Sequence, residues 1–515
     1  MKITWNWVVL LGIVAGAAFA EDEEKVEYKP MSIAALQEFG QLRSGQFGSY
    51  PPFTNEWVDH FGTFITQSVL IGETLTMNVG IGGLFQFQKR EEISPAWGGS
   101  QTKYFFVGPT VADVTYKSQL GSGSWSLGAG MFSFKYNPDA ANLGEYLFRA
   151  GAYPTFIMSG GYSFVNSSAV HGLEGLKANY SVGGFSADAL LLTETTLAPL
   201  YDLSLATLLK YGTPEGLFSM FGGVNFRHLV PVRPSLTNKK SAENSYFRNP
   251  TNPGDPLWYT GHRDYYREQE RFFERKRSAS TTAADSAVYL AKKDSVKAIF
   301  DLVSKKNNEV IDPATNLVGW LDSSTGQAPG AQYFSLQSVL MTVGASLDFK
   351  QVMGSEIFGP QDLRLYFEAA LLGLKDYPMF YTKKTQRLPV MVGFNFPGFK
   401  LLDLISLQYE WFDSPWLNSY ETRASRQIAV PSFGPGADPQ TSDKFFNDAA
   451  TNDKHSWSVL VRKEFAKGLS VSAQAARDHI RSVSLQNYAG PGMDPNEMLN
   501  TSKDWYWMLQ FSVGI

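Results

Sequence analysis

The feature that most constrains this fold is a long alternation of apolar and polar residues. Between Val69 and Gln88 nearly all odd positions are apolar, from Val69 and Ile71 to Phe85 and Phe87, and the even positions are mostly Thr, Asn, Gly or Gln. A period of two places successive side chains on opposite faces of a β-strand. The segment exceeds the roughly five or six residues of an ordinary soluble strand, but its length suits a strand that crosses a membrane at a tilt.

The same alternation recurs along the chain. We count fourteen such segments: 69–88, 104–119, 124–136, 169–181, 183–194, 202–211, 217–228, 334–350, 362–375, 388–396, 402–412, 455–465, 469–480 and 505–515. Short turns, which carry Gly121, Gly183 and Gly468, alternate along the chain with a second set of connections, and all the long loops belong to this second set. This spacing predicts an all-β chain: a transmembrane antiparallel up-and-down β-barrel with long extracellular loops. The topology requires an even number of strands, about 14, with 12 to 18 compatible with the pattern.

Closure of the sheet follows from the membrane environment, because lipid offers no hydrogen-bond partner to a free strand edge. The composition agrees, with only 18% charged residues, 14% aromatic residues and 46 Gly. A mean hydropathy of -0.19, without an internal apolar run near the roughly 18 residues of a spanning helix, excludes a helical membrane protein after the leader. The soluble alternative, a propeller or sandwich array, predicts shorter strands and a fixed repeat, and the sequence has neither.

The N-terminus predicts a secretory signal peptide, residues 1–20. Lys2 precedes an apolar stretch, and Ala18 and Ala20 form a small-residue cleavage site, with cleavage after Ala20. An N-terminal membrane anchor is the alternative. Residues 21–56 are expected to form a periplasmic extension or plug that contains a helix-like run, 31–42, and residues 57–515 are expected to form the barrel.

Charge and motifs exclude several functions. The 45 basic and 49 acidic residues give a net charge of -4, which does not favour nucleic-acid binding. The absence of cysteine excludes disulfides and thiolate chemistry. The six histidines lack metal-ligand spacing, and no nucleophile elbow or phosphate loop occurs. We therefore predict no catalytic site, no metal and no cofactor. A barrel hydrolase with a site built from separate strands is the enzymatic alternative.

The last segment carries a family resemblance. In residues 505–515 the odd positions are apolar or aromatic, and they include Trp507, Phe511, Val513 and the terminal Ile515. This pattern resembles the closing strand of bacterial outer-membrane β-barrel proteins, although most members end in Phe. The resemblance to porin-like barrels covers about residues 57–515 and assigns no subfamily. It implies a Gram-negative outer membrane with its lipid, both termini in the periplasm, and recognition by the barrel-assembly machinery.

Polar side chains on the face opposite the apolar one are candidates for lining the pore. Charges of both signs occupy these positions, at Asp113, Lys117, Asp188, Lys210, Arg227, Arg364, Glu368, Glu410, Arg462, Glu464 and Asp478. Charges inside a barrel need water or a partner, so this face predicts either a wet channel or salt bridges within the wall. Neither sign predominates enough to predict a charge preference.

Two long connections have features of their own. Porin-like channels often fold one early long loop inward, and by that resemblance Glu145 and Arg149 in the connection 137–168 are candidates for a constriction; a packed outer loop is the alternative. The insert 229–333 contains two helix-like runs, 263–277 and 283–305, with opposite charges three or four residues apart. They would form a small surface cap or a solvated loop.

These observations favour an outer-membrane channel for passive diffusion of small hydrophilic solutes, acting alone or as a homo-oligomer. One alternative is a gated barrel transporter for hydrophobic or larger ligands with an N-terminal plug. That alternative is similar to fatty-acid transport barrels in strand count, but residues 21–56 lack their Asn-Pro-Ala triplet. Another is a surface adhesion or polysaccharide-binding barrel that uses aromatic loop residues such as Trp258, Tyr259, Trp411 and Trp416.

Overall fold

The structure is a computed structural model of the 515-residue chain. It describes residues 26–45, 53–86, 105–132, 134, 137, 146–150, 152, 173–193, 201–232, 248–250, 270–278, 280–310, 331–333, 337–354, 356–374, 383–414, 454–478, 481–484, 492–497, 499 and 503–515.

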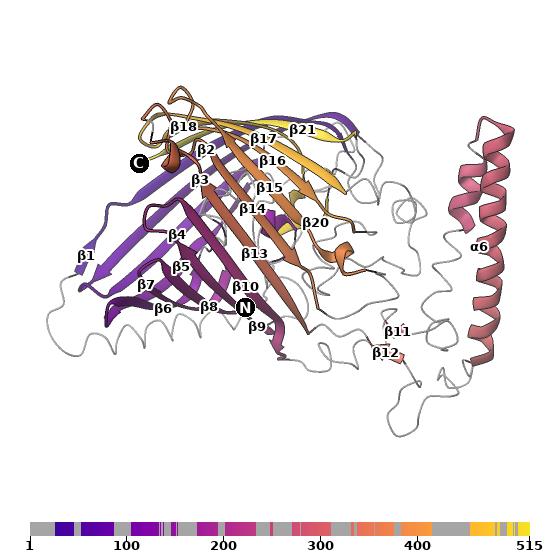
Figure 1. The fold of residues 1–515 in the computed structure, drawn as a ribbon, viewed down its shortest axis with the longest axis horizontal. Helices are drawn as coiled ribbons and strands as arrows, with labels where there is room; N and C mark the ends of the chain where they lie inside the picture. Colours follow the sequence, from indigo (N-terminus) through magenta and orange to yellow (C-terminus); the bar gives the residue numbers. More distant parts are fainter. Residues whose placement is uncertain are drawn as a thin grey trace, which may run out of the picture.

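The main element is a closed antiparallel β-barrel (Figure 1). Its strands are β2 (Ser32–Gly45), β3 (Phe53–Ile71), β4 (Leu75–Gln86), β5 (Phe105–Leu120), β6 (Gly123–Phe132), β7 (Leu173–Val182), β8 (Phe185–Thr193), β9 (Leu203–Gly212), β10 (Phe218–Val230), β13 (Ser338–Asp348), β14 (Arg364–Leu371), β15 (Val390–Phe396), β16 (Leu404–Trp411), β17 (His455–Ala466), β18 (Leu469–Arg477) and β21 (Trp505–Gly514). Each strand pairs with the next in this order, and β21 pairs with both β18 and β2. Every wall strand therefore has two neighbours and the barrel has no free edge.

A seventeenth strand of the same sheet, β1 (Val26–Tyr28), pairs with the end of β3, at Val69–Ile71. Since β2 pairs with β3 up to Thr66, β1 continues the line of β2 after a short interruption. The barrel itself thus has sixteen strands, seventeen minus β1. The described chain starts and ends at the same end of the barrel, where Ile33 and Ile515 exchange backbone hydrogen bonds. The tight turns lie there too, and we call it the short-turn end.

The predicted fold class and the even strand number are confirmed, but the count is sixteen rather than about 14. The two strands that the sequence analysis missed are β2 and β3. The helix-like run 31–42 was wrong, because these residues lie in β2, with Ser32–Gly45 paired on both sides. Residues 32–45 and 53–56 are therefore part of the barrel wall, where an extension or plug was expected. Pairing with two neighbours decides the local conformation here, since a wall strand satisfies every backbone group.

The segment 69–88 was predicted as one strand, but it contains a turn at residues 72–74. Ile71 at the end of β3 lies directly opposite Leu75 at the start of β4. Cross-strand partners face the same side of a sheet, and these two differ by an even number of positions, so the alternation runs through the turn unchanged. Gly72 in this turn has φ +60°, a conformation that glycine adopts without strain.

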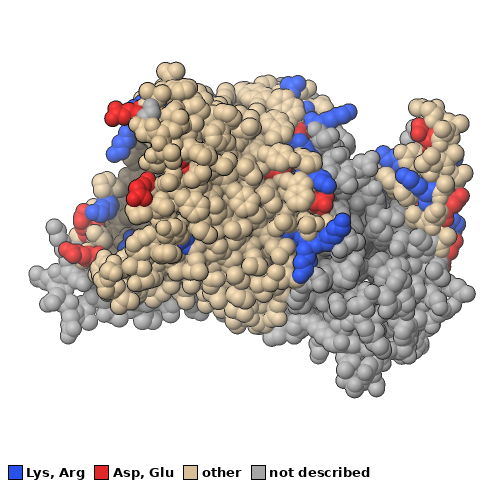
Figure 2. Space-filling model, in the orientation of Figure 1, with Lys and Arg blue, Asp and Glu red and all other residues tan. Residues whose placement is uncertain are grey.

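The outer face of the barrel is apolar. Side chains such as Val79, Leu209, Val343 and Val392 point outward and are 57%, 69%, 44% and 42% exposed. In Figure 2 the middle of the barrel surface carries almost no charge, and Lys, Arg, Asp and Glu gather toward its two ends. This distribution is that of a belt in contact with hydrocarbon.

Aromatic clusters border this belt at both ends of the strands. Near the long connections, Trp57 packs on Phe39 and Trp507, with ring centroids 5.1 Å and 5.8 Å apart. Near the short turns, Phe185 packs on Tyr211 at 4.7 Å. Aromatic girdles of this kind mark the two interfaces of a membrane-spanning barrel.

One part of the barrel interior holds an apolar core. The short helix α2 (Tyr146–Arg149) and the residues that follow it lie inside the wall, where Tyr146, Leu147, Ala150 and Ala152 are at most 2% exposed. They cluster with inward side chains of the wall: Phe132, Leu173, Leu190, Leu192, Ala206, Leu208, Phe221, Leu340, Tyr366, Ala370, Leu372, Met391 and Phe412. Asn225 on β10 also donates a hydrogen bond from Nδ2 to the carbonyl of Ala152 at 3.0 Å.

The insert 229–333 contains helices, as predicted: α6 (Ala283–Val310) and a helix over 270–278. Glu274 pairs with Arg277 within the helix 270–278, and it also pairs with Lys293 of α6 at 2.8 Å, which joins the two helices. Hydrogen bonds from Arg277 and then Lys293 lower the pKa of Glu274 from 4.5 to about 2. Within the described residues no helix is long and apolar enough to span a membrane. Two separate two-stranded sheets complete the described strands: β11 (Arg248–Pro250) with β12 (Ala331–Tyr333), and β19 (Arg481–Ser484) with β20 (Gly492–Glu497).

Candidate functional site: the inner face of the barrel

The inner face can be followed from strand to strand by the alternation of burial and by the register. On β16, for example, Leu404, Ser406, Gln408 and Glu410 are buried, and the intervening Leu407 and Tyr409 are 42% and 49% exposed. Inward positions along the whole wall are mostly Ser, Thr, Asn, Gln, Gly and charged residues. Ten of the eleven charged residues that the sequence analysis placed on the lumen side occupy inward positions in this register, and Asp478, one residue past the end of β18, is hydrogen-bonded to the inward side chain of Tyr506.

Asp113 on β5 is the centre of the first polar network. Its carboxylate accepts hydrogen bonds from Asn78 Nδ2 at 2.8 Å and Thr115 Oγ1 at 3.2 Å. Lys177 Nζ on β7 completes the set with an ion pair at 2.6 Å. The ammonium also lies over the ring of Phe132, 4.6 Å from its centroid, so it is held from two sides. Three strands of the wall, β4, β5 and β7, are thereby connected through one carboxylate.

A second network repeats this arrangement on the next strands. Asp188 on β8 accepts a hydrogen bond from Asn179 Nδ2 at 2.6 Å and pairs with Lys210 Nζ on β9 at 2.9 Å. Lys210 lies over the ring of Phe134 at 5.0 Å. In both networks an amide and an ammonium group hold one carboxylate against the wall.

A third carboxylate, Asp348 on β13, is shared by two cations. Arg364 on β14 pairs with it at 3.2 Å, and Lys350 of the short helix α7 (Lys350–Met353) pairs with it at 3.0 Å. Glu368, which the sequence places on the same face as Arg364, lies farther along β14 and is 3% exposed.

Deeper in the wall, several polar side chains are almost fully buried. Glu38 accepts a hydrogen bond from Gln510 Nε2 at 2.9 Å, which joins the first barrel strand to the last. Asp478 accepts one from the hydroxyl of Tyr506 at 3.2 Å. Arg227 and Glu410 are 2% and 1% exposed on the same inner face.

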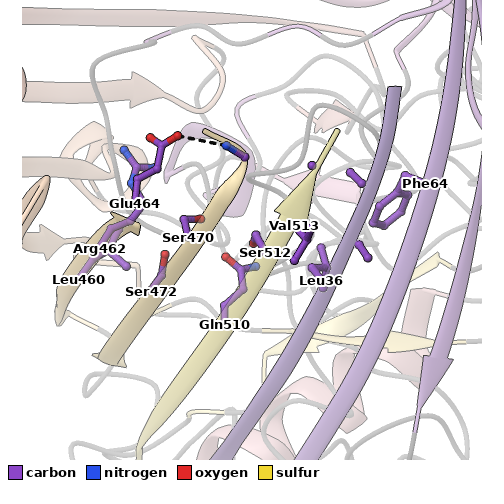
Figure 3. A pocket seen from close by; sticks show the side chains of 14 residues that line it. Leu36, Phe64, Leu460, Arg462, Glu464, Ser470, Ser472, Gln510, Ser512 and Val513 are labelled. Carbon is purple, nitrogen blue, oxygen red and sulfur yellow. Dashed lines mark hydrogen bonds between the residues drawn. The ribbon is translucent and has the colours of Figure 1, made fainter. Parts of the chain in front are cut away.

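Arg462 and Glu464 line an open cavity of about 450 Å³ at the short-turn end (Figure 3). On the neighbouring strands, small polar side chains come from β18 and β21, and apolar ones from β2 and β3: Ser470, Ser472, Gln510, Ser512, Leu36 and Phe64. Glu464 accepts a hydrogen bond from the backbone N–H of Gly468 in the adjoining turn, at 3.3 Å. At about 30 Å³ per molecule, a space of this size holds roughly 15 water molecules.

The remaining predicted residues are placed as follows. Lys117 occupies an exposed inward position near the short-turn end of β5. Arg149 lies in α2, inside the barrel, but its side chain is outside the described part of the structure, as are Glu145, Ala18 and Ala20. Of the residues in the terminal strand, Trp507, Phe511 and Val513 face outward in β21, which closes the sheet against β2, and Ile515 is 85% exposed at its end.

The sequence analysis missed Lys177, Asp348 and Asn78, which bind the residues it chose. Their signal was present, because each one lies at a polar position of an alternating segment: Lys177 with Asn179 and Ser181, and Asp348 with Ser346. The sequence does not predict which lysine pairs with Asp113, because the register between the strands decides that pairing. Among the described residues, no group of three or more His, Asp or Glu side chains could hold a metal ion.

No family model and no curated protein matches the sequence. Among solved structures, a mutant of the Rh. blastica porin aligns with 94% of this chain and 100% of its own length, at 8% identity and a TM-score of 0.37. Salmonella typhi OmpF in complex with daunomycin aligns with 96% and 98%, at 9% identity and a TM-score of 0.39. The fold assignment rests on the barrel itself: its closed sheet, apolar outer face and polar inner face define a porin-like outer-membrane β-barrel.

Proposed function

We propose that this protein is an outer-membrane channel through which small hydrophilic solutes diffuse passively. The observation that carries the proposal is the open cavity inside the wall, lined by Ser470, Ser472, Ser512, Arg462 and Glu464. Hydroxyl and charged groups can replace part of the hydration shell of a polar solute, so it need not lose all its hydrogen bonds on entering. Sixteen strands are also enough to enclose an aqueous channel.

The closed barrel supports the same function. Its apolar belt lets the wall sit in lipid, and its inner face is polar. In the proposed orientation the short-turn end faces the periplasm, and the long connections with α6 lie outside the cell. The helix α2 and its neighbours occupy the part of the interior near β8–β10 and β13–β15. Solutes would therefore pass on the other side, along β17, β18, β21 and β2.

Single-channel conductance of the refolded protein in a planar bilayer tests the proposal. We expect stable open steps and swelling of liposomes in small neutral sugars. Ser472→Trp should lower the conductance because Ser472 lines the cavity. The matched control is Val471→Trp, one position away on the outer face of β18, where an aromatic side chain meets lipid and should leave the conductance unchanged. A bilayer that stays silent would refute the channel, and equal effects of both variants would refute this pathway.

A further inference from the structure

Three ion-pair groups on the described part of the inner face share one asymmetry. In each group the carboxylate is covered and its cation is open to the lumen. The side chains of Asp113, Asp188 and Asp348 are 3%, 9% and 3% exposed. Those of their partners Lys177, Lys210 and Arg364 are 26%, 30% and 17% exposed.

The asymmetry has a simple cause in side-chain length. An aspartate is short, and amide and hydroxyl donors such as Asn78, Thr115 and Asn179 hold it against the sheet. A lysine or arginine reaches over that carboxylate, so its cationic end is the part that water meets. A solute inside the barrel therefore encounters the cations of these pairs rather than their carboxylates.

Two further cations add to this surface. Lys117 is exposed on β5 and Arg462 is half-buried in the cavity wall of β17. Within the described residues, neither has a carboxylate partner within 4.0 Å. Glu464 is an accessible acid at an inward position of β17, and the turns at this end carry both signs, with Glu73 and Glu215 against Lys400 and Lys467.

We propose that the short-turn half of the lumen favours small anions, such as inorganic and carboxylate anions, over cations. This inference rests on the proposed channel function and names its preferred solutes. Basic side chains in a passage with low-dielectric walls raise the local anion concentration, as they do in anion-conducting pores. By Coulomb's law in water, one charge at about 10 Å changes the local concentration of a monovalent ion about twofold.

The test is the reversal potential of single channels in a KCl gradient at low ionic strength, where screening is weak. We expect chloride to be more permeant than potassium. The Lys117→Gln/Arg462→Gln variant should lower the chloride-to-potassium permeability ratio by about fourfold per charge removed, because each charge changes the chloride and potassium concentrations about twofold in opposite directions. Among the described residues, neither Lys117 nor Arg462 is the ion-pair partner of a buried carboxylate, so the double variant should still fold.

Two control variants bound the result. Glu464→Gln should raise the ratio, and Lys297→Gln on exposed α6 should leave it unchanged. Open channels that prefer potassium, or a ratio that the double variant leaves unaltered, would overturn the anion preference and leave the channel function standing. A folded barrel without conductance would overturn both.

Discussion

Gly393→Ala is expected to destabilise the barrel because the ring of Tyr366 covers Gly393. The two residues are direct cross-strand partners on β15 and β14. A Cβ added at Gly393 would lie 2.3 Å from two ring carbons of Tyr366 and 2.6 Å from its hydroxyl. Carbon atoms in proteins do not approach this closely, so the ring must move.

The ring has little freedom to do so. Tyr366 is 0% exposed, and its hydroxyl is hydrogen-bonded to Ser406 Oγ at 2.6 Å and to Gln408 Nε2 at 2.7 Å. Overpacking a buried site costs about 1–3 kcal/mol, and each hydrogen bond lost costs about 0.5–1.5 kcal/mol. With both hydrogen bonds lost, the expected loss in the free energy of unfolding is therefore about 2–6 kcal/mol.

Equilibrium urea unfolding in lipid vesicles, followed by tryptophan fluorescence, measures this change. Gly222→Ala is the matched control, because a Cβ at Gly222 on β10 has no other atom within 4 Å and should change stability by less than about 0.5 kcal/mol. In a Tyr366→Ala background the cost of Gly393→Ala should largely disappear. Equal losses for both glycines, or an unchanged cost without the Tyr366 ring, would refute the steric argument.

Three further predictions, two substitutions and one pH titration, test other parts of the structure. Lys177→Met should destabilise the barrel by about 3 kcal/mol, because Asp113 is then buried without its cation, and urea unfolding of the Asp113→Asn/Lys177→Met double variant should recover most of the loss. Val79→Arg, on the outer face, should cost about 2–4 kcal/mol in the same assay, and the comparably exposed Val288→Arg on α6 should cost almost nothing. Because its pKa is lowered, Glu274 should stabilise the helical insert above pH 4.5 and lose this contribution as the pH falls to about 2; an NMR titration of its carboxyl group with a midpoint near 4.5 would contradict this.

The sequence predicts most of the wall because the barrel's two faces are chemically opposite. Where one face of a strand contacts lipid and the other contacts polar groups, apolar and polar residues alternate in the sequence. On β6, for example, Trp125 and Leu127 alternate with Ser124 and Ser126. That is why each predicted segment overlaps a barrel strand. The same contrast identified the charged inner-face residues, since a charge in a wall strand has only the inner side available.

The sequence fails where this contrast is weak. On β2 the outward positions include Gln37 as well as Phe39, and the inward positions include Leu36 as well as Glu38. Neither face is uniformly apolar, so the local pattern does not distinguish a wall strand from a short helix. Only the pairing of β2 with β3 and β21 decides that this segment is a strand. Glu38 and Gln510 are 472 residues apart in the sequence, so their pairing leaves no pattern in the sequence around β2.

The last prediction concerns the link between wall packing and pore width. Phe64 lines the cavity, and its ring lies over Gly82, its cross-strand partner on β4. A Cβ at Gly82 would lie 2.6 Å from Cδ1 of Phe64, so Gly82→Ala should tilt the ring away from the wall and into the cavity. Phe221 over Gly344 and Tyr366 over Gly393 repeat this arrangement. Glycine thus lets aromatic rings lie flat on the inner face, and at Gly82 this arrangement would keep the proposed passage wide. Single-channel recordings of Gly82→Ala should show reduced conductance with Gly222→Ala unchanged, and an unaltered conductance in a folded Gly82→Ala barrel would show that the ring does not limit the passage.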